Sequence, residues 1–528
     1  MIWSDKTCNE IQPTKTKFLQ NEKFINFEAK QETTYQNMSL KPLTDALLKQ
    51  LRSGDAEQVD IALTRIEAQG YDLLPWKREF TELSTFIQVP SGKNVFQTVA
   101  QIYAVKQLKV NQKELSSLPD SFRFLSQVEF LDASENLLTE LPDWISEWHS
   151  LKELNVKNNQ IVSIPKSIHQ IEGLRKIDLS HNGLDHIPLS ILGLKTLEEL
   201  DLSHNEINQV PDEVGYLQGL ELLNLSYNPV ENCPESLGDL QSLTELNLSH
   251  ATLTQFPLGL HRAKSLKILQ LSHNQLSELP YELGQMTQLL ALNLSHNQIQ
   301  SVPAAIGKMS SLQQLILEHN QIDFLPDGIC LLSELQELHI QDNQLQGLPA
   351  QIGHMSSLQV IYGERNKITE VPESLNQLKQ LKDLWLQNNH IVQLPEQWEG
   401  LTSLEYINLS QNPLKKIPKS IASLPQLKNL LLAHTQIQSI HSSFLVLSLD
   451  EFDVSGTAWE KNRIIEEDKK QVVKTTEETS IPSEKKEKRK KKEEDEEDED
   501  DDGGCFTGFT LLIVASGGII YAILSSVF

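Results

Sequence analysis

One phrase returns every 23 residues along most of the chain, and this period limits the fold more than any other feature of the sequence. Leu266–Pro280 reads LKILQLSHNQLSELP, and matching stretches begin at Leu289 (LLALNLSHNQIQSVP) and Leu312 (LQQLILEHNQIDFLP). No insertion breaks the period between Lys113 and Thr435. A fixed period of this length predicts a solenoid, because one repeat cannot bury its apolar side chains without its neighbours.

The alternation of apolar and polar residues predicts a short strand in every repeat. Leu269 and Leu271 would point inward, and Gln270 between them would face the opposite, concave side. Strands of successive repeats would stack in parallel, and segments such as Pro280–Gln288 would form a short helix or 3₁₀ turn on the convex side. The predicted fold class is therefore α/β, with a curved parallel sheet.

One asparagine follows the strand in nearly every repeat. Its amide can both donate and accept, so it can satisfy backbone groups where the chain leaves the strand. Lys113, Ala251 and Thr435 interrupt the column. We predict a structural asparagine ladder formed by Asn136, Asn159, Asn182, Asn205, Asn228, Asn274, Asn297, Asn320, Asn343, Asn366, Asn389 and Asn412.

The spacing L-x-x-L-x-L-x-x-N-x-L resembles that of leucine-rich repeat proteins and covers residues 105–459. The repeat length and the closing Leu-Pro resemble the intracellular subclass typified by Ras-suppressor and Scribble-like proteins. This resemblance implies a solenoid that binds a protein partner on its concave face, in signalling. It does not identify the partner.

The segments before the array differ from it in composition. Residues 1–40 are polar without sustained periodicity, which predicts disorder. Helical spacing begins near Leu43, Asp55 with Gln58 resembles a helix N-cap pair, and another helical stretch is expected within 76–104. We predict a helical cap over the first repeat at residues 41–104; a separate effector domain is the alternative.

The segments after the array suggest a membrane anchor. Residues 460–502 form a charged linker with the run KKEKRKKK at 485–492, and are predicted to be disordered. Residues 503–528 carry no charge. As a helix from Cys505 they would span about 36 Å, enough for a hydrocarbon core of about 30 Å. We predict a single transmembrane tail anchor; a C-terminal sorting signal and a buried hydrophobic hairpin are the alternatives.

Charge and cysteine content indicate the setting of the repeat domain. The net charge of −26 argues against nucleic acid as a partner. The four cysteines are far apart, and the first residues, MIWSDKTCNEIQ, lack an apolar core of signal-peptide length. The basic run before the apolar stretch places the repeats on the cytoplasmic side.

Catalytic signatures are missing from the sequence. We find no phosphate-binding G-x-x-x-x-G-K-[ST] loop, kinase motif set, G-x-S-x-G elbow, H-E-x-x-H or CxxC pair. The sequence therefore predicts a non-enzyme without catalytic residues, metal or cofactor. Two alternatives remain. The protein could regulate an enzyme, or be one through residues 41–104; or it could be a surface-displayed adhesin.

A row of histidines occupies the position just before the asparagine ladder. Zinc requires ligands that converge, whereas these would lie in a line, and repetition of a favourable Ser-His-Asn phrase explains them more simply. A metal-binding row or a pH-sensitive row is the alternative. The row comprises His181, His204, His250, His273, His296, His319 and His434.

The residues between the two strand leucines change character along the array. They are polar from Lys109 to Asn293 and then become large and partly apolar. Because clustered aromatic side chains are typical of interface centres, we predict a partner-binding surface on the concave face. The alternative is that Tyr362 fills the space left by Gly363, while Trp385 shields the sheet. The predicted surface consists of Ile316, His339, Tyr362, Arg365 and Trp385.

Overall fold

The computed structural model describes residues 41–69, 71–87, 95–461, 512–515 and 518–521. Contacts divide the chain into two units, Met1–Ile465 and Glu466–Phe528. The prediction of disorder for residues 1–40 falls outside the described residues, and so does that for 460–502 except at Glu460 and Lys461, which are helical.

A curved parallel sheet runs through the array, with its strands in chain order and each paired to the next. The pairs from β3 to β17 keep the repeat spacing, as where Leu269 pairs with Leu246 on one side and Leu292 on the other, and only the last pair, β17 with β18, is one residue shorter. The predicted solenoid is confirmed. The strands are β3 (Gln107–Lys109), β4 (Phe130–Asp132), β5 (Glu153–Asn155), β6 (Lys176–Asp178), β7 (Glu199–Asp201), β8 (Leu222–Asn224), β9 (Glu245–Asn247), β10 (Ile268–Gln270), β11 (Ala291–Asn293), β12 (Gln314–Ile316), β13 (Glu337–His339), β14 (Val360–Tyr362), β15 (Asp383–Trp385), β16 (Tyr406–Asn408), β17 (Asn429–Leu431) and β18 (Glu451–Asp453).

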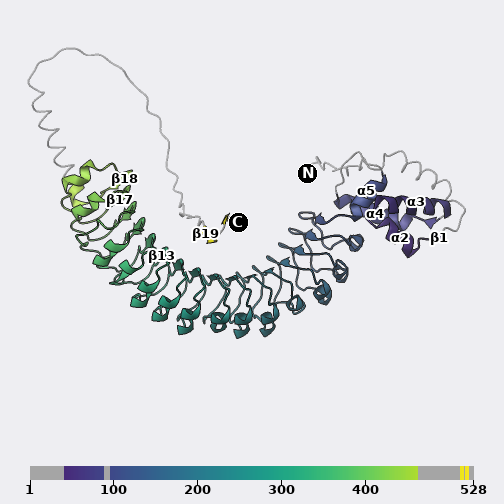
Figure 1. The fold of residues 1–528 in the computed structure, drawn as a ribbon, viewed down its shortest axis with the longest axis horizontal. Helices are drawn as coiled ribbons and strands as arrows, with labels where there is room; N and C mark the ends of the chain where they lie inside the picture. The colour runs from purple at the N-terminus through teal and green to yellow at the C-terminus, as the bar shows by residue number, and fades with distance from the viewer. Residues whose placement is uncertain (1–40, 70, 88–94, 462–511, 516–517, 522–528) are drawn as a thin grey trace, which may run out of the picture. The chain divides into compact units, whose positions relative to one another are not determined.

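Short 3₁₀ helices connect the strands and line the outer side of the arc, while the strands line its inner side (Figure 1). The proline that ends the repeat phrase usually precedes the helix in extended conformation, as Pro280 does. The helices are η2 (Asp120–Phe124), η3 (Asp143–Glu147), η4 (Lys166–Gln170), η5 (Ile191–Gly193), η6 (Asp212–Tyr216), η7 (Glu235–Asp239), η8 (Leu258–Arg262), η9 (Tyr281–Gln285), η10 (Ala304–Lys308), η11 (Asp327–Leu331), η12 (Ile352–His354), η13 (Glu373–Gln377), η14 (Lys419–Ser423) and η15 (Ser442–Val446).

The core is a continuous column of aliphatic side chains between strands and 3₁₀ helices. Leu269 and Leu271 of one repeat and Leu292 and Leu294 of the next are almost fully buried. Burying each such side chain contributes about 1.5–3 kcal/mol relative to exposure. Each repeat obtains much of this burial from its neighbours, so the array gains stability as a stack.

The asparagine ladder completes the backbone hydrogen bonding between repeats. The Oδ1 atom of Asn297 accepts from the Leu276 N–H at 3.0 Å. Its Nδ2 donates to three carbonyls, those of Leu271 in the preceding repeat (2.9 Å) and of Leu294 and Ser295 in its own. One side chain therefore joins two turns of the solenoid. The other asparagines of the ladder make the equivalent contacts.

Among the residues described before the array, the helices are α2 (Asp45–Leu51), α3 (Ala56–Gln69), α4 (Leu74–Phe86) and α5 (Val95–Tyr103). Asp55 caps α3, since its Oδ1 accepts from the N–H groups of Glu57 and Gln58. The Gln58 side chain does not return this bond; its Oε1 accepts instead from Gln50. A short parallel pair, β1 (Lys41–Pro42) with β2 (Tyr71–Asp72), was not predicted.

These helices pack against the first repeat, as a cap would. The Phe86 ring meets Phe122 of η2 edge-on at 5.1 Å, and the Arg52 guanidinium lies 3.4 Å from the centre of the Phe124 ring. Arg52 also donates to Glu79, which accepts from the Tyr103 hydroxyl. Burial next to that carboxylate raises the Tyr103 pKa well above its ordinary value.

In the second unit, the described residues differ from the predicted helix. They form an antiparallel pair of strands, β19 (Leu512–Ala515) and β20 (Gly518–Tyr521). β-Branched and aromatic residues such as Val514, Ile519 and Tyr521 favour extended backbone, and an apolar run alone does not distinguish strand from helix. No helix among the described residues is long and apolar enough to cross a membrane.

The ladder contacts lead to a stability prediction. Asn297→Ala removes four hydrogen bonds and leaves the buried Leu276 N–H without its acceptor, so we expect a loss of about 2–4 kcal/mol in the free energy of unfolding. Urea unfolding followed by circular dichroism measures it. The neighbouring exposed Gln298→Ala is the control, expected to change it by less than about 0.5 kcal/mol. Equal effects of the two substitutions would contradict a role for the ladder.

Candidate protein-binding surface

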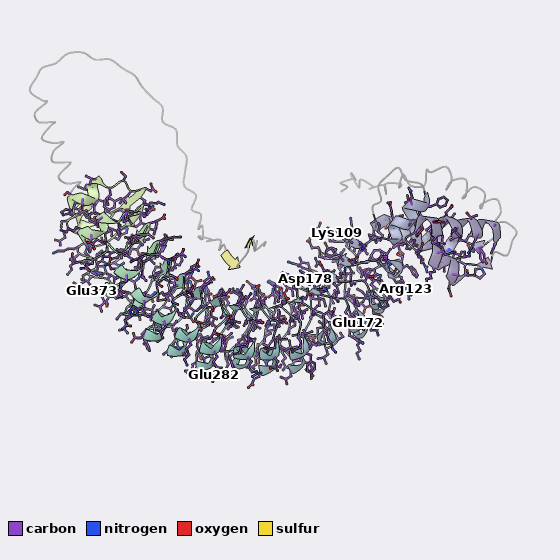
Figure 2. The ribbon with its side chains drawn as sticks, viewed as in Figure 1. Lys109, Arg123, Glu172, Asp178, Glu282 and Glu373 are labelled. Carbon is purple, nitrogen blue, oxygen red and sulfur yellow. The ribbon has the colours of Figure 1, made fainter. Side chains whose placement is uncertain are left out.

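On the first half of the concave face, polar side chains largely satisfy one another. The Asp178 carboxylate accepts from both the N–H and the hydroxyl of Ser180, and Asp201 does the same with Ser203. Figure 2 shows Lys109 and Asp178 on the inner side of the arc, and Glu282 and Glu373 on the outer side. At the third strand position, this part of the inner wall mostly presents small groups that are already hydrogen-bonded.

From β13 to β16 the concave face becomes aromatic. The centre of the His339 ring lies 4.6 Å from that of Tyr362, and the Tyr362 ring centre lies 6.0 Å from that of Trp385. Trp385 stacks on Tyr406 at 4.1 Å. We call these four residues the concave aromatic cluster. Tyr362, Trp385 and Tyr406 are half-buried, so each ring keeps a surface available for contact.

Two members of this cluster differ from the sequence prediction. His339 is only 3% exposed, because its neighbours cover it and its Nε2 lies 3.3 Å from Glu337 Oε2; it supports the surface without forming its outer layer. Tyr406 is an addition to the predicted surface. It is the first residue of its strand, and the prediction followed only the third residue of each strand, although both face the concave side.

Gly363 does not distort the strand that carries Tyr362. β14 keeps its register with both neighbours, pairing Tyr362 with His339 and with Trp385. A Cβ atom at Gly363 would meet Leu386 Cδ2 at 3.0 Å, so the Leu386 side chain occupies the space a larger residue would need. The Tyr362 ring is not required to fill it.

Beside the aromatic cluster, longer polar residues replace the serines found in most other repeats. Ser295 and its counterparts give way to Glu318, Gln341, Glu364 and Gln387. Gln341 donates to Glu318. Burial raises the pKa of Glu364 above its ordinary value. This strip is therefore more acidic than the serines it replaces, and several of its side-chain oxygens have no hydrogen-bond partner among the described residues.

Of the remaining predicted residues, Ile316 lies on β12 next to His339 and is half-buried. Arg365 lies elsewhere. It belongs to the row just before the asparagine ladder, where its Nε and Nη2 donate to the two Asp342 carboxylate oxygens at 2.6 and 2.7 Å. The guanidinium is already paired with a carboxylate, so we do not count it among the contacting groups.

The histidine row forms a stack of rings at the edge of the sheet. His181, His204, Tyr227, His250, His273, His296 and His319 follow one another at centre-to-centre distances of 3.9–4.2 Å, with planes 10–18° apart. All have φ between 52 and 56°, in the left-handed region. The repeat pattern did not predict this backbone, although asparagine, aspartate and histidine are enriched there.

Stacking and partial burial disfavour charge on these imidazoles. Burial and the neighbouring histidines lower the pKa of His273 from 6.5 to about 4, and burial lowers that of His250 and His296. Parallel rings also direct their nitrogens side by side instead of toward one point. Among the described residues, no group of three or more histidine, cysteine or acidic side chains could hold a metal ion.

Comparisons with known proteins agree with this architecture. A family model described as a leucine-rich repeat region matches residues 280–383; one described as a leucine rich repeat matches 136–184, 195–253 and 380–437, and another of that description matches 265–286. The solved structure of the repeat protein LIC12759 of Leptospira interrogans is 35% identical, covering 62% of this chain and 84% of that one, with a TM-score of 0.60. The chain belongs to the leucine-rich repeat proteins.

Members of this family are generally binding modules without catalytic activity. The leucine-rich repeat ectodomain of the Arabidopsis receptor kinase HAESA, solved with a peptide hormone, is 27% identical over 68% of this chain and 67% of that chain, with a TM-score of 0.50. The plant peptide hormone receptor RGFR1, solved with RGF2, is 23% identical over 68% and 64%, with a TM-score of 0.53, and shows the fold alone. No curated protein matches the chain.

The histidine stack of this leucine-rich repeat protein predicts acid sensitivity. The pKa of His273 is about 4 in the folded protein, against an ordinary value of 6.5, so the unfolded chain binds more protons between these two pH values. The contribution of the neutral His273 to the free energy of unfolding is therefore complete above pH 6.5 and is lost as pH falls toward 4. We expect the urea midpoint to fall between pH 7 and pH 5.

Substitution isolates the contribution of the stack. Tyrosine already replaces histidine at Tyr227, so His273→Tyr should keep the stack and reduce the pH dependence. His390→Tyr, at an exposed histidine outside the stack, should not change it. Urea midpoints at both pH values test this; an unchanged pH dependence in His273→Tyr would rule out the stack as its source.

Proposed function

We propose that this protein is a non-enzymatic scaffold that binds a protein partner on the concave face, through the aromatic cluster. The observation that carries the proposal is the position of Tyr362, Trp385 and Tyr406: they lie on adjacent strands, outside the leucine core, with ring surface left uncovered. Aromatic side chains grouped in this way supply most of the energy at the centres of protein interfaces.

The binding of peptides by relatives supports this choice of partner. The HAESA ectodomain was solved in complex with a peptide hormone. In the present chain the inner wall is formed by strands that are paired on both sides, so the rings are held in place before a partner arrives. Such preorganisation lowers the entropic cost of binding.

Membrane attachment and a signalling role are further parts of the proposal and rest on the sequence. The uncharged stretch 503–528 would hold the protein at a bilayer, with the repeats in the cytoplasm. The resemblance to Ras-suppressor and Scribble-like arrays suggests signalling partners. A membrane span is not required for the concave-face proposal, so the two parts can be tested separately.

Capture of the partner tests the concave face. Partners identified by proximity labelling from the array should be pulled down by the full chain, and Tyr362→Ala with Trp385→Ala should reduce capture at least about tenfold, because interface hot spots contribute about 2 kcal/mol or more each. Tyr216→Ala with Tyr281→Ala, at exposed tyrosines of η6 and η9, is the control. Capture that survives the first pair of substitutions would refute the proposed site.

Extraction tests the membrane part. We expect the full chain to stay with membranes in alkaline carbonate and to be released when residues 503–528 are deleted. Protease added to intact cells should leave the array uncut if it faces the cytoplasm. Release of the full chain by carbonate would reject the anchor, and cleavage on intact cells would favour a surface-displayed protein.

A further inference from the structure

Next to the concave aromatic cluster, several buried polar atoms lack a hydrogen-bond partner among the described residues. They come from three consecutive repeats: Gln341 Oε1, Glu364 Oε2, and both Trp385 Nε1 and Gln387 Oε1. Buried polar atoms are almost always paired, because leaving them unpaired costs their full desolvation. A group of such atoms in one place therefore calls for an explanation.

The unpaired atoms are mainly acceptors. Three are oxygens and one is an N–H. Gln341 is nine-tenths buried, and its own amide N–H is already committed to Glu318. The missing partner must therefore supply several donors in a small space. Lysine offers three N–H groups and arginine five, and neither offers an acceptor.

The local charge favours the same kind of partner. The Glu364 and Asp383 carboxylates lie on the strands of the cluster or just beyond them, whereas Glu337 on β13 is already hydrogen-bonded to His339 and Gln314. Nearby cations are engaged: Arg365 is paired with Asp342, and Lys382 donates to Gln359 Oε1 at 3.0 Å. Burial raises the pKa of both Glu364 and Asp383, and the neighbouring charges of Arg365 and Lys382 only partly offset this effect.

The aromatic rings complete the arrangement. The faces of tyrosine and tryptophan rings attract cations, most strongly where water is excluded. Tyr362 and Trp385 lie on neighbouring strands, directly beside the strip that holds Glu364 and Gln387. A cation resting on these rings would have the unpaired oxygens within reach after a small rotamer change, which is common when interfaces form.

We infer that the concave aromatic cluster recognises a lysine or arginine side chain of a partner protein, with the cation against Tyr362 and Trp385 and its N–H groups donated to Glu364 and Gln387. This inference rests on the proposed function, since it assumes that a protein binds this face. It adds the chemistry of the residue recognised. It also accounts for the replacement of serine by glutamate and glutamine in these repeats.

Peptide selection tests the inference even while the natural partner is unidentified. Random 12-residue peptides displayed on phage are selected on the full chain and counter-selected on the Tyr362→Ala, Trp385→Ala variant. Among peptides that need the aromatic pair, we expect lysine or arginine enriched at one position. Dependence on the pair without such enrichment overturns the inference and leaves the proposed function intact. Finding no peptide that needs the pair overturns both.

A double-mutant cycle on one selected peptide then locates the contact. Glu364→Gln keeps the side-chain shape and should weaken binding about tenfold, as expected for loss of a charge-assisted hydrogen bond. The same substitution should have no effect on a peptide whose basic residue is replaced by methionine. Glu373→Gln, at an exposed glutamate of η13, is the charge-matched control. Equal weakening by Glu373→Gln would show a general charge effect and overturn the assignment.

Discussion

The backbone hydrogen bonds between one repeat and the next are the constraint on which the structure depends. The paired strand covers three residues in each repeat, and a few further backbone bonds, such as that from the Leu271 N–H to the Asn293 carbonyl, follow before the chain turns outward. The asparagine ladder supplies the bonds that this departure would leave unmade. With the backbone satisfied, the leucines can stack, and the concave side chains are free to vary.

That freedom is used unevenly. Over the first half of the array the third strand position and the residue two beyond it carry mostly aspartates, asparagines and serines that bond to each other, and such groups offer a partner little. From β13 to β15 these positions carry aromatic rings and unpaired acceptors, and Tyr406 adds a ring at the first position of β16. The scaffold is uniform, so the difference lies in side chains alone. The candidate site can therefore be traced to a few substitutions on a constant backbone.

Much of this arrangement could be predicted from the sequence. The 23-residue period predicted the boundaries of the repeats, and the alternation within each strand distinguished the core leucines from the concave residues. Tyr362 and Trp385 were recognisable as large aromatic residues in a row that is polar in most other repeats. Tyr406 was not predicted because each strand has two positions that face the concave side and only one of them was considered. The burial of His339 depends on the ring of Tyr362 on the next strand. Left-handed backbone in the histidine row follows from turn geometry, which hydrophobic periodicity does not report. The strands at 512–515 and 518–521 were not predicted, because an apolar run is compatible with either helix or strand.

The constant register between neighbouring strands has an evolutionary consequence. Leu269 pairs with the equivalent leucine of the repeat on either side, so a duplicated repeat could be inserted between two existing ones without altering contacts elsewhere in the array. Gene duplication could thus lengthen the inner wall in whole steps, moving the aromatic region farther from the helical end while preserving its internal geometry. The length of the solenoid and the binding properties of its aromatic region would then evolve independently in this protein.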